Sequence, residues 1–522
     1  MERRQWQPTR LSFVLAPVLL ASALLPSVWG QAPAPSLTPG VQSSVGELLP
    51  RSEGLDALVR GCNRCHLITA VIGTRRDRAA WTATVENMRG RGATVSDSEA
   101  ASIVAYLSEH FGPGSTTPGP AGARGGIFMM SGRVPDVQPT PGQPLETRNA
   151  VGAGQLPAFE GQTRAPAVRT STTTAATVVA SGLRHPWSLA FLPDGRMLVS
   201  EKPGALRIVT ATGEVGPPIT GVPRVVFGGD AGLLDVVLDP AFETTHQIFF
   251  SFVEPRDGGN GVVVARARLS RNETALEDVT NVLRVEPTVA GNGHYGGRLH
   301  FDRNGHVLVT LGERFDRQVR VQAQHLDSRL GKILRLNSDG TAPPGNPFAG
   351  RTDGLPDVWS YGHRNPQGLA FHPLTGELWS IEHGEAGGDE LNIIRPGRNY
   401  GWPLIGYGTE YDLRPINGGR TSAPNMEQPA YFWDPAIGPT SMVFYDGVLV
   451  PEWRHNLFVT SRIGQHLARL VFDGDRVIGE ERLLLDQRQM MRWVGQGPDG
   501  ALWVLTDHQD GRLIRLAPSG TR

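Results

Sequence analysis

Pro498-Asp499-Gly500-Ala501-Leu502-Trp503-Val504 is a turn that leads directly into an apolar strand, and this pattern decides the fold. Five further copies precede it, at 193–199, 239–250, 302–309, 373–379 and 451–459. Six copies over residues 176–522 give about 58 residues per unit, the size of a four-stranded sheet with its loops. Because radial repetition of such sheets forms a β-propeller, the sequence predicts an all-β propeller with six blades. The alternative left by the pattern is a pair of β-sandwiches.

The length and composition of the chain fit this reading and require a second domain. The chain has 522 residues, more than one hydrophobic core usually supports. It contains 64 glycines and 41 prolines, which suits a turn-rich β protein. The formal net charge is −1, so no excess of charge indicates a nucleic-acid partner.

The first 30 residues have the pattern of a secretory signal peptide. Arg3, Arg4 and Arg10 form a positive region, an apolar stretch follows at 11–25, and small residues near Gly30 offer a cleavage site. The alternative is a membrane anchor, but the apolar run is shorter than the roughly 20 residues that a spanning helix needs. No second stretch has the length to span a membrane, so the sequence predicts a periplasmic or secreted protein.

The cysteines define the second predicted domain. The chain has two, Cys62 and Cys65, and both lie in Cys62-Asn63-Arg64-Cys65-His66, the spacing of a covalent haem c attachment site. A thioredoxin-like redox pair is the alternative, and it does not require His66. Residues 46–114 show helical periodicity, with Trp81, Val85 and Met88 on one face. The sequence therefore predicts a small all-α cytochrome c domain over 46–114, preceding the propeller.

The haem iron needs two axial ligands in an electron-transfer cytochrome. His66 is the first, and Met88 is the preferred second ligand because it lies inside the domain on a helix face. His110 is a rival, and Met129 and Met130 are more distant alternatives. Met88 as a simple core residue also remains open.

Residues 115–175 are rich in Pro, Gly, Ser and Thr and have no sustained periodicity. The sequence predicts a linker here that lets the cytochrome domain move relative to the propeller, which occupies 176–522.

Three loop segments of the propeller carry more polar residues than a plain blade needs. They are 291–299, with His294 between glycines; 361–369, with Arg364, Asn365 and Gln367; and 382–390, rich in acidic residues and glycine. Carboxylates and backbone carbonyl groups without thiolates suit a hard cation such as Ca²⁺. The alternatives are a blade-core histidine, a structural arginine and a solvated acidic loop.

These segments resemble the soluble quinoprotein glucose dehydrogenases and aldose sugar dehydrogenases, also called the glucose/sorbosone dehydrogenases. The resemblance covers residues 178–517 and includes further motifs at 185–187, 232–235, 331–336 and 497–500. It implies a six-bladed propeller, the cofactor pyrroloquinoline quinone held by Ca²⁺, and sugar substrates oxidised at an alcohol carbon.

The resemblance also implies roles for individual residues. His294 matches the family base, a role that suits an imidazole because its pKa lies near neutrality. The cofactor contacts implied are Arg364, Asn365, Gln367 and Arg492, and the Ca²⁺ contacts implied are Gly384 and Glu385.

Four positions depart from the family pattern. Asp230 stands where a glutamine is common, and Gly293 stands where the glucose enzymes have an acidic residue. Ile463 replaces a cofactor-binding lysine, with Arg462 adjacent, and Met490 replaces the first of two arginines. Loss of two cations would weaken the binding of a polyanionic cofactor.

The expected function is that of a quinohaemoprotein dehydrogenase, in which a sugar or alcohol hydroxyl is oxidised at the quinone and the fused haem c passes electrons to an external cytochrome or quinone pool. Ile463 and Met490 favour a rival, a non-catalytic binding propeller that carries an electron-transfer cytochrome. A Ca²⁺-dependent hydrolase or lactonase is a third reading, and it does not explain the haem motif.

Overall fold

The computed structural model describes residues 52–62, 75–90, 93, 95–115, 134–135, 138–411 and 414–520. The predicted signal peptide at 1–30, together with Cys65 and His66, lies outside these residues, as do the side chains of residues 59–62. Within the described ranges, no helix combines the length and the apolar character needed to cross a membrane.

Three helices lie among the described residues between 52 and 115. The helices are α2 (Leu55–Cys62), α4 (Arg78–Gly90) and α5 (Asp97–His110). The N-cap of α5 is Ser96: its hydroxyl accepts the N–H of Glu99, whose side chain in turn accepts the N–H of Ser96. A small apolar cluster joins the three helices, with Leu58 and Trp81 among its fully buried members.

The remaining strands form six antiparallel sheets of four strands each, so the predicted six-bladed propeller is confirmed and the sandwich alternative is wrong. The first sheet contains β2 (Pro186–Phe191), β3 (Met197–Glu201), β4 (Ala205–Val209) and β5 (Val215–Pro218). The second contains β6 (Leu233–Leu238), β7 (Gln247–Arg256), β8 (Gly259–Leu269) and β9 (Leu276–Arg284). The third contains β10 (Gly296–Phe301), β11 (Val307–Leu311), β12 (Lys332–Leu336) and β13 (Val358–Tyr361).

The other three blades complete the ring. The fourth contains β14 (Pro366–Phe371), β15 (Leu378–Glu382), β16 (Asp389–Ile394) and β17 (Tyr431–Trp433). The fifth contains β18 (Pro439–Phe444), β19 (Leu457–Ser461), β20 (His466–Asp473) and β21 (Arg476–Leu483). The sixth contains β22 (Met491–Gln496), β23 (Leu502–Thr506), β24 (Gly511–Pro518) and β1 (Thr174–Leu183). Short helical turns lie between strands, namely α7 (Phe242–Thr245), η1 (Arg320–Gln324), η2 (Ile416–Gly419), η3 (Pro451–Trp453) and η4 (Leu485–Gln487).

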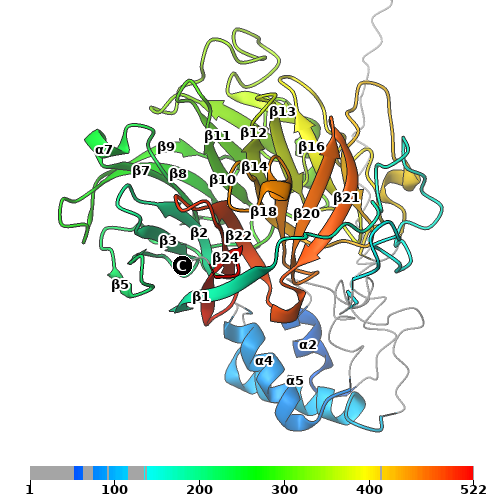
Figure 1. Cartoon of the computed structure of the whole chain (residues 1–522). Helices are drawn as coiled ribbons and strands as arrows, with labels where there is room; N and C mark the ends of the chain where they lie inside the picture. The colour runs from blue at the N-terminus through cyan, green and yellow to red at the C-terminus, as the bar shows by residue number, and fades with distance from the viewer. Residues whose placement is uncertain are drawn as a thin grey trace, which may run out of the picture. The chain divides into compact units, whose positions relative to one another are not determined.

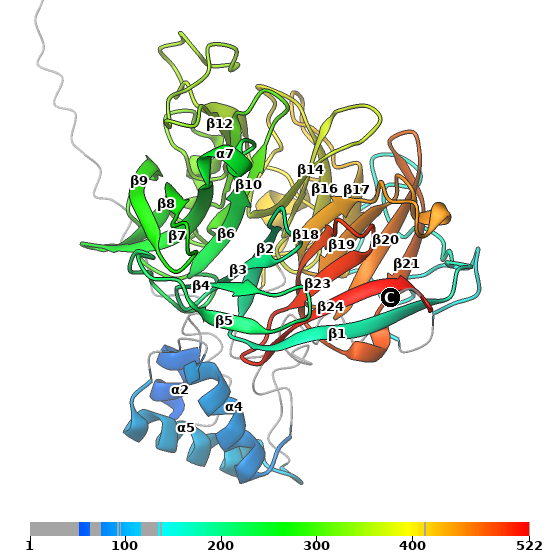
Figure 2. The same cartoon turned by 60° about the vertical axis from the view of Figure 1, so that its left-hand side comes forward.

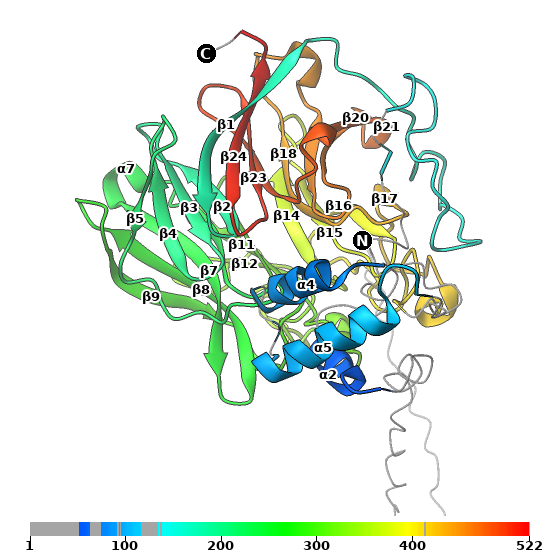
Figure 3. The ribbon, with the colours of Figure 1, turned by 90° about the horizontal axis from the view of Figure 1, so that it is seen from below.

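The sixth blade closes the ring, because its outer strand β1 comes from the start of the propeller and pairs antiparallel with β24 from the end. Figures 1, 2 and 3 show β1 beside β24 from three directions. The first strands of consecutive blades contact each other all the way round, including β22 with β2. Closure therefore gives every blade a packed neighbour on each side, so that the inner edge of each sheet is covered.

The repeated turn in the sequence has one structural meaning. All six copies connect the inner strand of a blade to its second strand, which is β3, β7, β11, β15, β19 or β23. Gly195 and Gly500 occupy the left-handed region, with φ of +86° and +76°, which explains the glycine in the clearest copies. The period in the sequence is therefore the blade itself.

A polar cluster on the inner strands fills the centre of the ring. The buried Arg298 of β10 donates hydrogen bonds to the carboxylate of Asp235 at 3.1 Å and to the carbonyl oxygens of Gln367 at 2.9 Å and Thr440 at 3.1 Å. Its guanidinium also lies 4.1 Å from the centre of the Trp187 ring. One cation thus connects five blades, which fixes the inner strands on which the site is built.

The second half of the predicted linker is packed on the propeller and is not a free connection. Residues 138–173 run along the fourth and fifth blades, with isolated bridges from Thr163 to Phe432 and from Ala167 to Glu480. The N–H groups of Val151 and Gly152 each donate to the carboxylate of Asp434 at 2.8 Å. The sequence missed this strap because its backbone groups pair mainly with side chains and single bridges, which leave no periodic pattern.

One ion cluster fastens the strap, and its loss should destabilise the propeller. Glu146 bonds Arg148 at 2.5 Å and the buried Arg482 of β21 at 2.7 Å. Burial opposes its charge, but these two arginines lower the pKa of Glu146 to about 2. We expect Glu146→Ala to reduce the free energy of unfolding by about 3 kcal/mol, since Arg482 would be left buried without this partner.

Calorimetry at neutral pH measures this loss. The matched control is Glu277→Ala, which breaks a pair with Arg268 in which both side chains are 43% exposed, and it should change stability by less than about 0.5 kcal/mol. The stabilisation by Glu146 should also disappear as the pH falls from about 4.5 towards 2, because its folded-state pKa is depressed. Equal effects of the two variants would contradict the role of the strap.

Candidate active site

The register of the blades gathers the predicted site residues at one end of the ring. In each blade the first residues of the inner strand pair with the last residues of the second strand, as Pro366 with Glu382 and Met491 with Thr506. Loops that enter an inner strand and loops that leave a second strand therefore meet at the same end, near the axis. Residues more than 300 positions apart in the chain become neighbours there, as His185 and Asp507 are at 3.4 Å.

His294 lies in the loop that enters β10, and its partner is Glu313, which follows β11. Its Nδ1 lies 2.5 Å from Oε1 of Glu313, and both side chains are buried. This contact leaves Nε2 of His294 as the ring nitrogen available to a substrate. His294 itself has a φ of +48°, and the glycines around it allow the loop to hold the imidazole in this strained position.

The protonation of the pair decides whether His294 is a base. Burial, followed by the Arg364 cation, lowers the pKa of His294 well below its usual range. Burial raises the pKa of Glu313 to about 7, although Arg364 acts in the opposite direction. When Glu313 is ionised it accepts the Nδ1 proton and Nε2 has a lone pair; when Glu313 is protonated it donates to Nδ1, and the ring proton lies on Nε2.

Asp230 and His383 lie beside this base. The carboxylate of Asp230 accepts the backbone N–H of His294 at 3.3 Å and lies 3.5 Å from the guanidinium of Arg462. Burial lowers the pKa of His383 to about 3, although the carboxylate of Asp230 opposes this, so this imidazole is neutral. Its Nε2 is buried and has no hydrogen-bond partner.

Arg364 lies in the loop that enters β14 and is 2% exposed. Its guanidinium donates to the Glu385 carboxylate at 2.8 Å, the Tyr411 hydroxyl at 3.2 Å and the carbonyl oxygen of Gly384. The backbone N–H of Arg364 donates to Glu382 at 2.7 Å, which fixes the turn. The Nε atom of Arg364 has no partner despite its burial.

The predicted Ca²⁺ contacts are the backbone carbonyl groups of Gly384 and Glu385. Arg364 donates to the carbonyl oxygen of Gly384, whereas its contact with Glu385 is to the side-chain carboxylate. Burial raises the pKa of Glu385 to about 7, which disfavours the ionised carboxylate that Ca²⁺ binds best. Among the residues described, no group of three or more His, Cys, Asp or Glu side chains is arranged to hold a metal ion. The segment 382–390 is not a solvated loop, because Glu382 and Asp389 are buried.

A second group of cations surrounds Asp507, which follows β23. Arg492 of β22 donates to its carboxylate, and the guanidinium of Arg462 lies 3.6 Å from it. The Nε of Arg492 is buried without a partner. Lys202 is also buried, and burial lowers its pKa to about 8, although Asp507 opposes this. Arg462 and Lys202 thus bring positive charge close to Asp507.

Asn365 and Gln367 form hydrogen bonds beneath the loops that carry the other site residues, on the inner-strand side. Both are buried, and the side-chain oxygen of Asn365 accepts from the N–H of Gly296 and from Nε2 of Gln367, each at 3.0 Å. The amide nitrogen of Asn365 lies 3.3 Å from Nδ1 of His383. These contacts hold the loops of the third and fourth blades together.

The residues predicted for haem are only in part within the described chain. Cys62 is the last residue of α2, and Met88 is half-buried on α4 without belonging to the apolar cluster of the helices. The rival ligand His110 has its Nε2 2.7 Å from the hydroxyl of Ser52.

Sequence reasoning missed Glu313, Lys202 and Asp507, and it noted Arg462 only as a neighbour of Ile463. They share one signal, since each lies within two residues of the end of a second strand. Given the repeat, a charged residue at that position of a blade is a site candidate.

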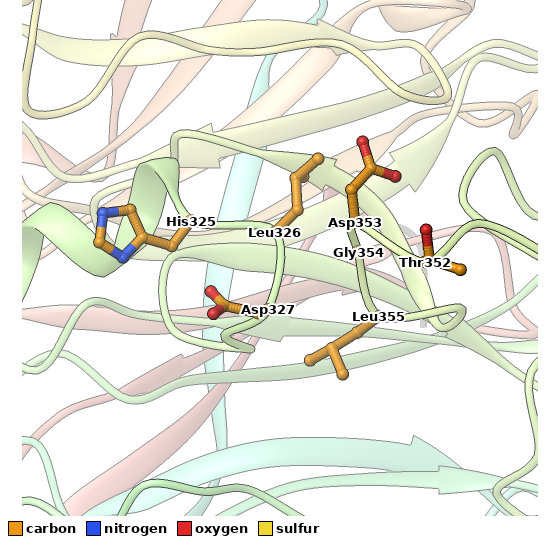
Figure 4. Close-up of a pocket in the computed structure, with 7 residues that line it drawn as sticks. All are labelled: His325, Leu326, Asp327, Thr352, Asp353, Gly354 and Leu355. Atoms are coloured by element: carbon orange, nitrogen blue, oxygen red, sulfur yellow. The ribbon is translucent and has the colours of Figure 1, made fainter. Parts of the chain in front are cut away.

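A surface pocket of about 500 Å³ lies between two loops elsewhere in the propeller. Figure 4 shows its lining residues, His325, Leu326, Asp327, Thr352, Asp353, Gly354 and Leu355. None of them belongs to the cluster of buried, perturbed ionisable groups around His294, which is the better candidate for chemistry.

Known proteins resemble this chain over the propeller. A sequence profile of the Glucose / Sorbosone dehydrogenase family matches residues 183–515. The aldose sugar dehydrogenase YliI of Escherichia coli is 39% identical over 344 residues, which cover 65% of this chain and 92% of that protein.

Two solved dehydrogenase structures are also similar to this chain. A glucose dehydrogenase crystal structure is 44% identical with a TM-score of 0.64, covering 65% of this chain and 99% of that chain. The aldose sugar dehydrogenase of Streptomyces coelicolor, solved in a PQQ-bound form, is 28% identical with a TM-score of 0.55, covering 67% and 99% respectively. The matched part is the propeller and its end-face cluster.

Proposed function

The chain belongs to the glucose/sorbosone dehydrogenase family, and from this premise we propose that it oxidises a sugar hydroxyl with pyrroloquinoline quinone and passes the electrons to a covalently attached haem c. The proposed site is the cluster around His294. We further propose that the protein works in the periplasm, as the signal sequence at 1–30 indicates, and delivers electrons to an external cytochrome or quinone pool.

The observation that supports the proposal best is the excess of unpartnered buried donors at the site. Nε of Arg364, Nε of Arg492 and Nε2 of His383 are buried without hydrogen bonds, and such groups are costly unless a ligand satisfies them. A quinone with several carboxylates supplies acceptors for these donors, and Lys202 and Arg462 supply further positive charge. The residues present therefore fit this cofactor.

The quinone supplies a two-electron acceptor for the hydride that leaves the substrate carbon. Nε2 of His294 takes the hydroxyl proton as the C–H bond breaks, and the ionised Glu313 stabilises the imidazolium that results. Arg364 stays charged and stabilises negative charge near the quinone oxygens. The burial of His294 and Glu313 keeps water from competing for the proton.

The haem is proposed from the Cys62–His66 motif, with His66 and Met88 as axial ligands. A half-buried Met88 outside the apolar cluster is free to turn its thioether to an iron, whereas the ring of His110 is already engaged by Ser52. A one-electron acceptor on the same chain would re-oxidise a two-electron cofactor stepwise.

The pH dependence follows from Glu313. Because its pKa is raised to about 7, the base-competent form of His294 should increase through neutrality, and kcat/KM should rise by about 10-fold between pH 6 and 8. Glu313→Gln removes this titration, so the low residual rate of the variant should be flat over the same range. A wild-type profile without an inflection near pH 7 would contradict the assignment.

Reconstitution tests the whole proposal. The purified holocytochrome is mixed with pyrroloquinoline quinone, with and without Ca²⁺, and the reduced-haem absorption bands are followed on addition of aldoses. Haem reduction that requires both quinone and sugar is the expected result. If the quinone binds and sugar is oxidised only when an artificial acceptor is added, without haem reduction, the proposed electron path to the haem is refuted. If the quinone does not bind, the proposed dehydrogenase activity is refuted.

A further inference from the structure

The segment that follows β11 contains two consecutive strained residues. Arg314 and Phe315 have φ of +77° and +57°, a left-handed conformation that side chains with a Cβ rarely adopt. Strain of this kind persists only where surrounding contacts impose it, and it is concentrated at ligand-binding sites. The contacts that impose it here are made by Arg314.

Arg314 is an anchor. It is 3% exposed, and its guanidinium donates to the carbonyl oxygen of Asn260 at 3.0 Å and to the side-chain oxygen of Asn260 at 2.7 Å. The same guanidinium lies 4.2 Å from the centre of the Tyr295 ring. The buried arginine fixes the turn, and the next residue is presented outwards.

That next residue is an exposed aromatic ring beside the proposed base. The ring centre of Phe315 lies 4.6 Å from that of His294 and 5.6 Å from that of Tyr411. Phe315 is 38% exposed and belongs to none of the apolar clusters among the described residues, so it is not there to fill a core. Its position is explained by a ligand that approaches His294 from the solvent.

Gly293 makes room for this ring. A Cβ at position 293 would lie 3.0 Å from the Cβ of Phe315 and 3.4 Å from two of its ring carbons. A larger side chain would push the ring away from His294. This is the physical reason for the departure at Gly293 noted in the sequence.

We propose that Phe315 is a substrate-positioning residue whose ring stacks on the C–H face of a cyclic sugar, so that the hydroxyl of that sugar meets Nε2 of His294. The inference rests on the proposed function and narrows its substrate class to pyranoses in preference to open-chain alcohols. Aromatic rings bind amphipathic ligands through their faces, and polar groups at the rim fix the orientation. Asp230, whose side chain is 30% exposed, provides such a polar group for the remaining hydroxyls.

Steady-state kinetics of Phe315→Ala test the proposal on aldopyranoses and on the matching alditols, which have the same hydroxyls without a ring. With quinone saturating, the KM for aldopyranoses should rise about 10-fold, while kcat falls less than about 3-fold and the kinetics for alditols stay unchanged. Phe315→Tyr should restore the wild-type KM, because it keeps the ring. Val321→Ala is the control, since it removes an apolar side chain that is 42% exposed on η1, and it should behave as wild type.

A binding measurement separates failure of this inference from failure of the proposed function. Saturation-transfer NMR on the protein without added quinone should show pyranose ring protons close to the protein, and Phe315→Ala should weaken that signal. If the wild type binds pyranoses but turns none over with quinone, the proposed function fails and the stacking stands. If Phe315→Ala leaves both the KM and the NMR signal unchanged, or lowers quinone affinity instead, the inference is overturned.

Discussion

Replacing His294 by alanine should lower kcat by about 10²- to 10⁴-fold, the usual contribution of a positioned general base. The reason is geometric, since Glu313 holds Nδ1 and leaves Nε2 to take the substrate proton. The affinity for quinone should change little, because the cations proposed to bind it, Arg462, Arg492 and Lys202, belong to other blades. Turnover at saturating quinone gives kcat, and a separate titration of the quinone gives its affinity.

The matched control is His455→Ala, a histidine outside the site whose nearest charged partner is Asp446 at 3.6 Å. It should retain wild-type turnover. If His294→Ala kept activity within a few-fold of wild type, another group would have to accept the proton. A parallel loss of quinone affinity would instead indicate that His294 holds the cofactor.

Replacing Arg364 by lysine should weaken quinone binding by about 10- to 100-fold, which corresponds to the loss of one charge-assisted hydrogen bond. Lysine keeps the charge but not the planar set of donors, of which Nε is the one left unpartnered in the structure. Retaining the charge also avoids leaving Glu385 unpaired, so the variant should fold. The affinity is measured by titration of the quinone, followed by its absorbance or fluorescence.

Arg335→Lys is the control, because Arg335 is also largely buried and paired, with Asp302 at 2.9 Å, but lies outside the site. It should bind quinone as the wild type does. Equal weakening by both variants would show a general effect on the fold and not a cofactor contact. Unchanged affinity in Arg364→Lys would remove Arg364 from the binding site.

The sequence predicted the six-bladed architecture, because each copy of the turn-and-strand pattern can be recognised from its own residues alone. The turn at 498–504 and its five copies mark the second strand of every blade. The polar loops that contain His294 and Arg364 were also found, and the resemblance to the family implied the roles of the two residues; both signals are local to each loop. The strap at 138–173 was not found, because its stabilising contacts are made with residues such as Asp434 and Arg482, roughly 300 positions away.

The sequence by itself determined six repeated blades, and it predicted a haem attachment motif and the residue types of a hydride-transfer site. Only the tertiary structure decided which charges face one another. Lys202, Arg462, Arg492 and Asp507 meet because closure of the ring places the first blade beside the sixth, which also contacts the fifth. The strained turn that places Phe315 over His294 depends on Arg314 and Asn260 from a neighbouring blade. Local patterns depend on the spacing of residues along the chain. The partners of a charged residue in a closed ring depend on the register between strands, and this register cannot be read from the spacing.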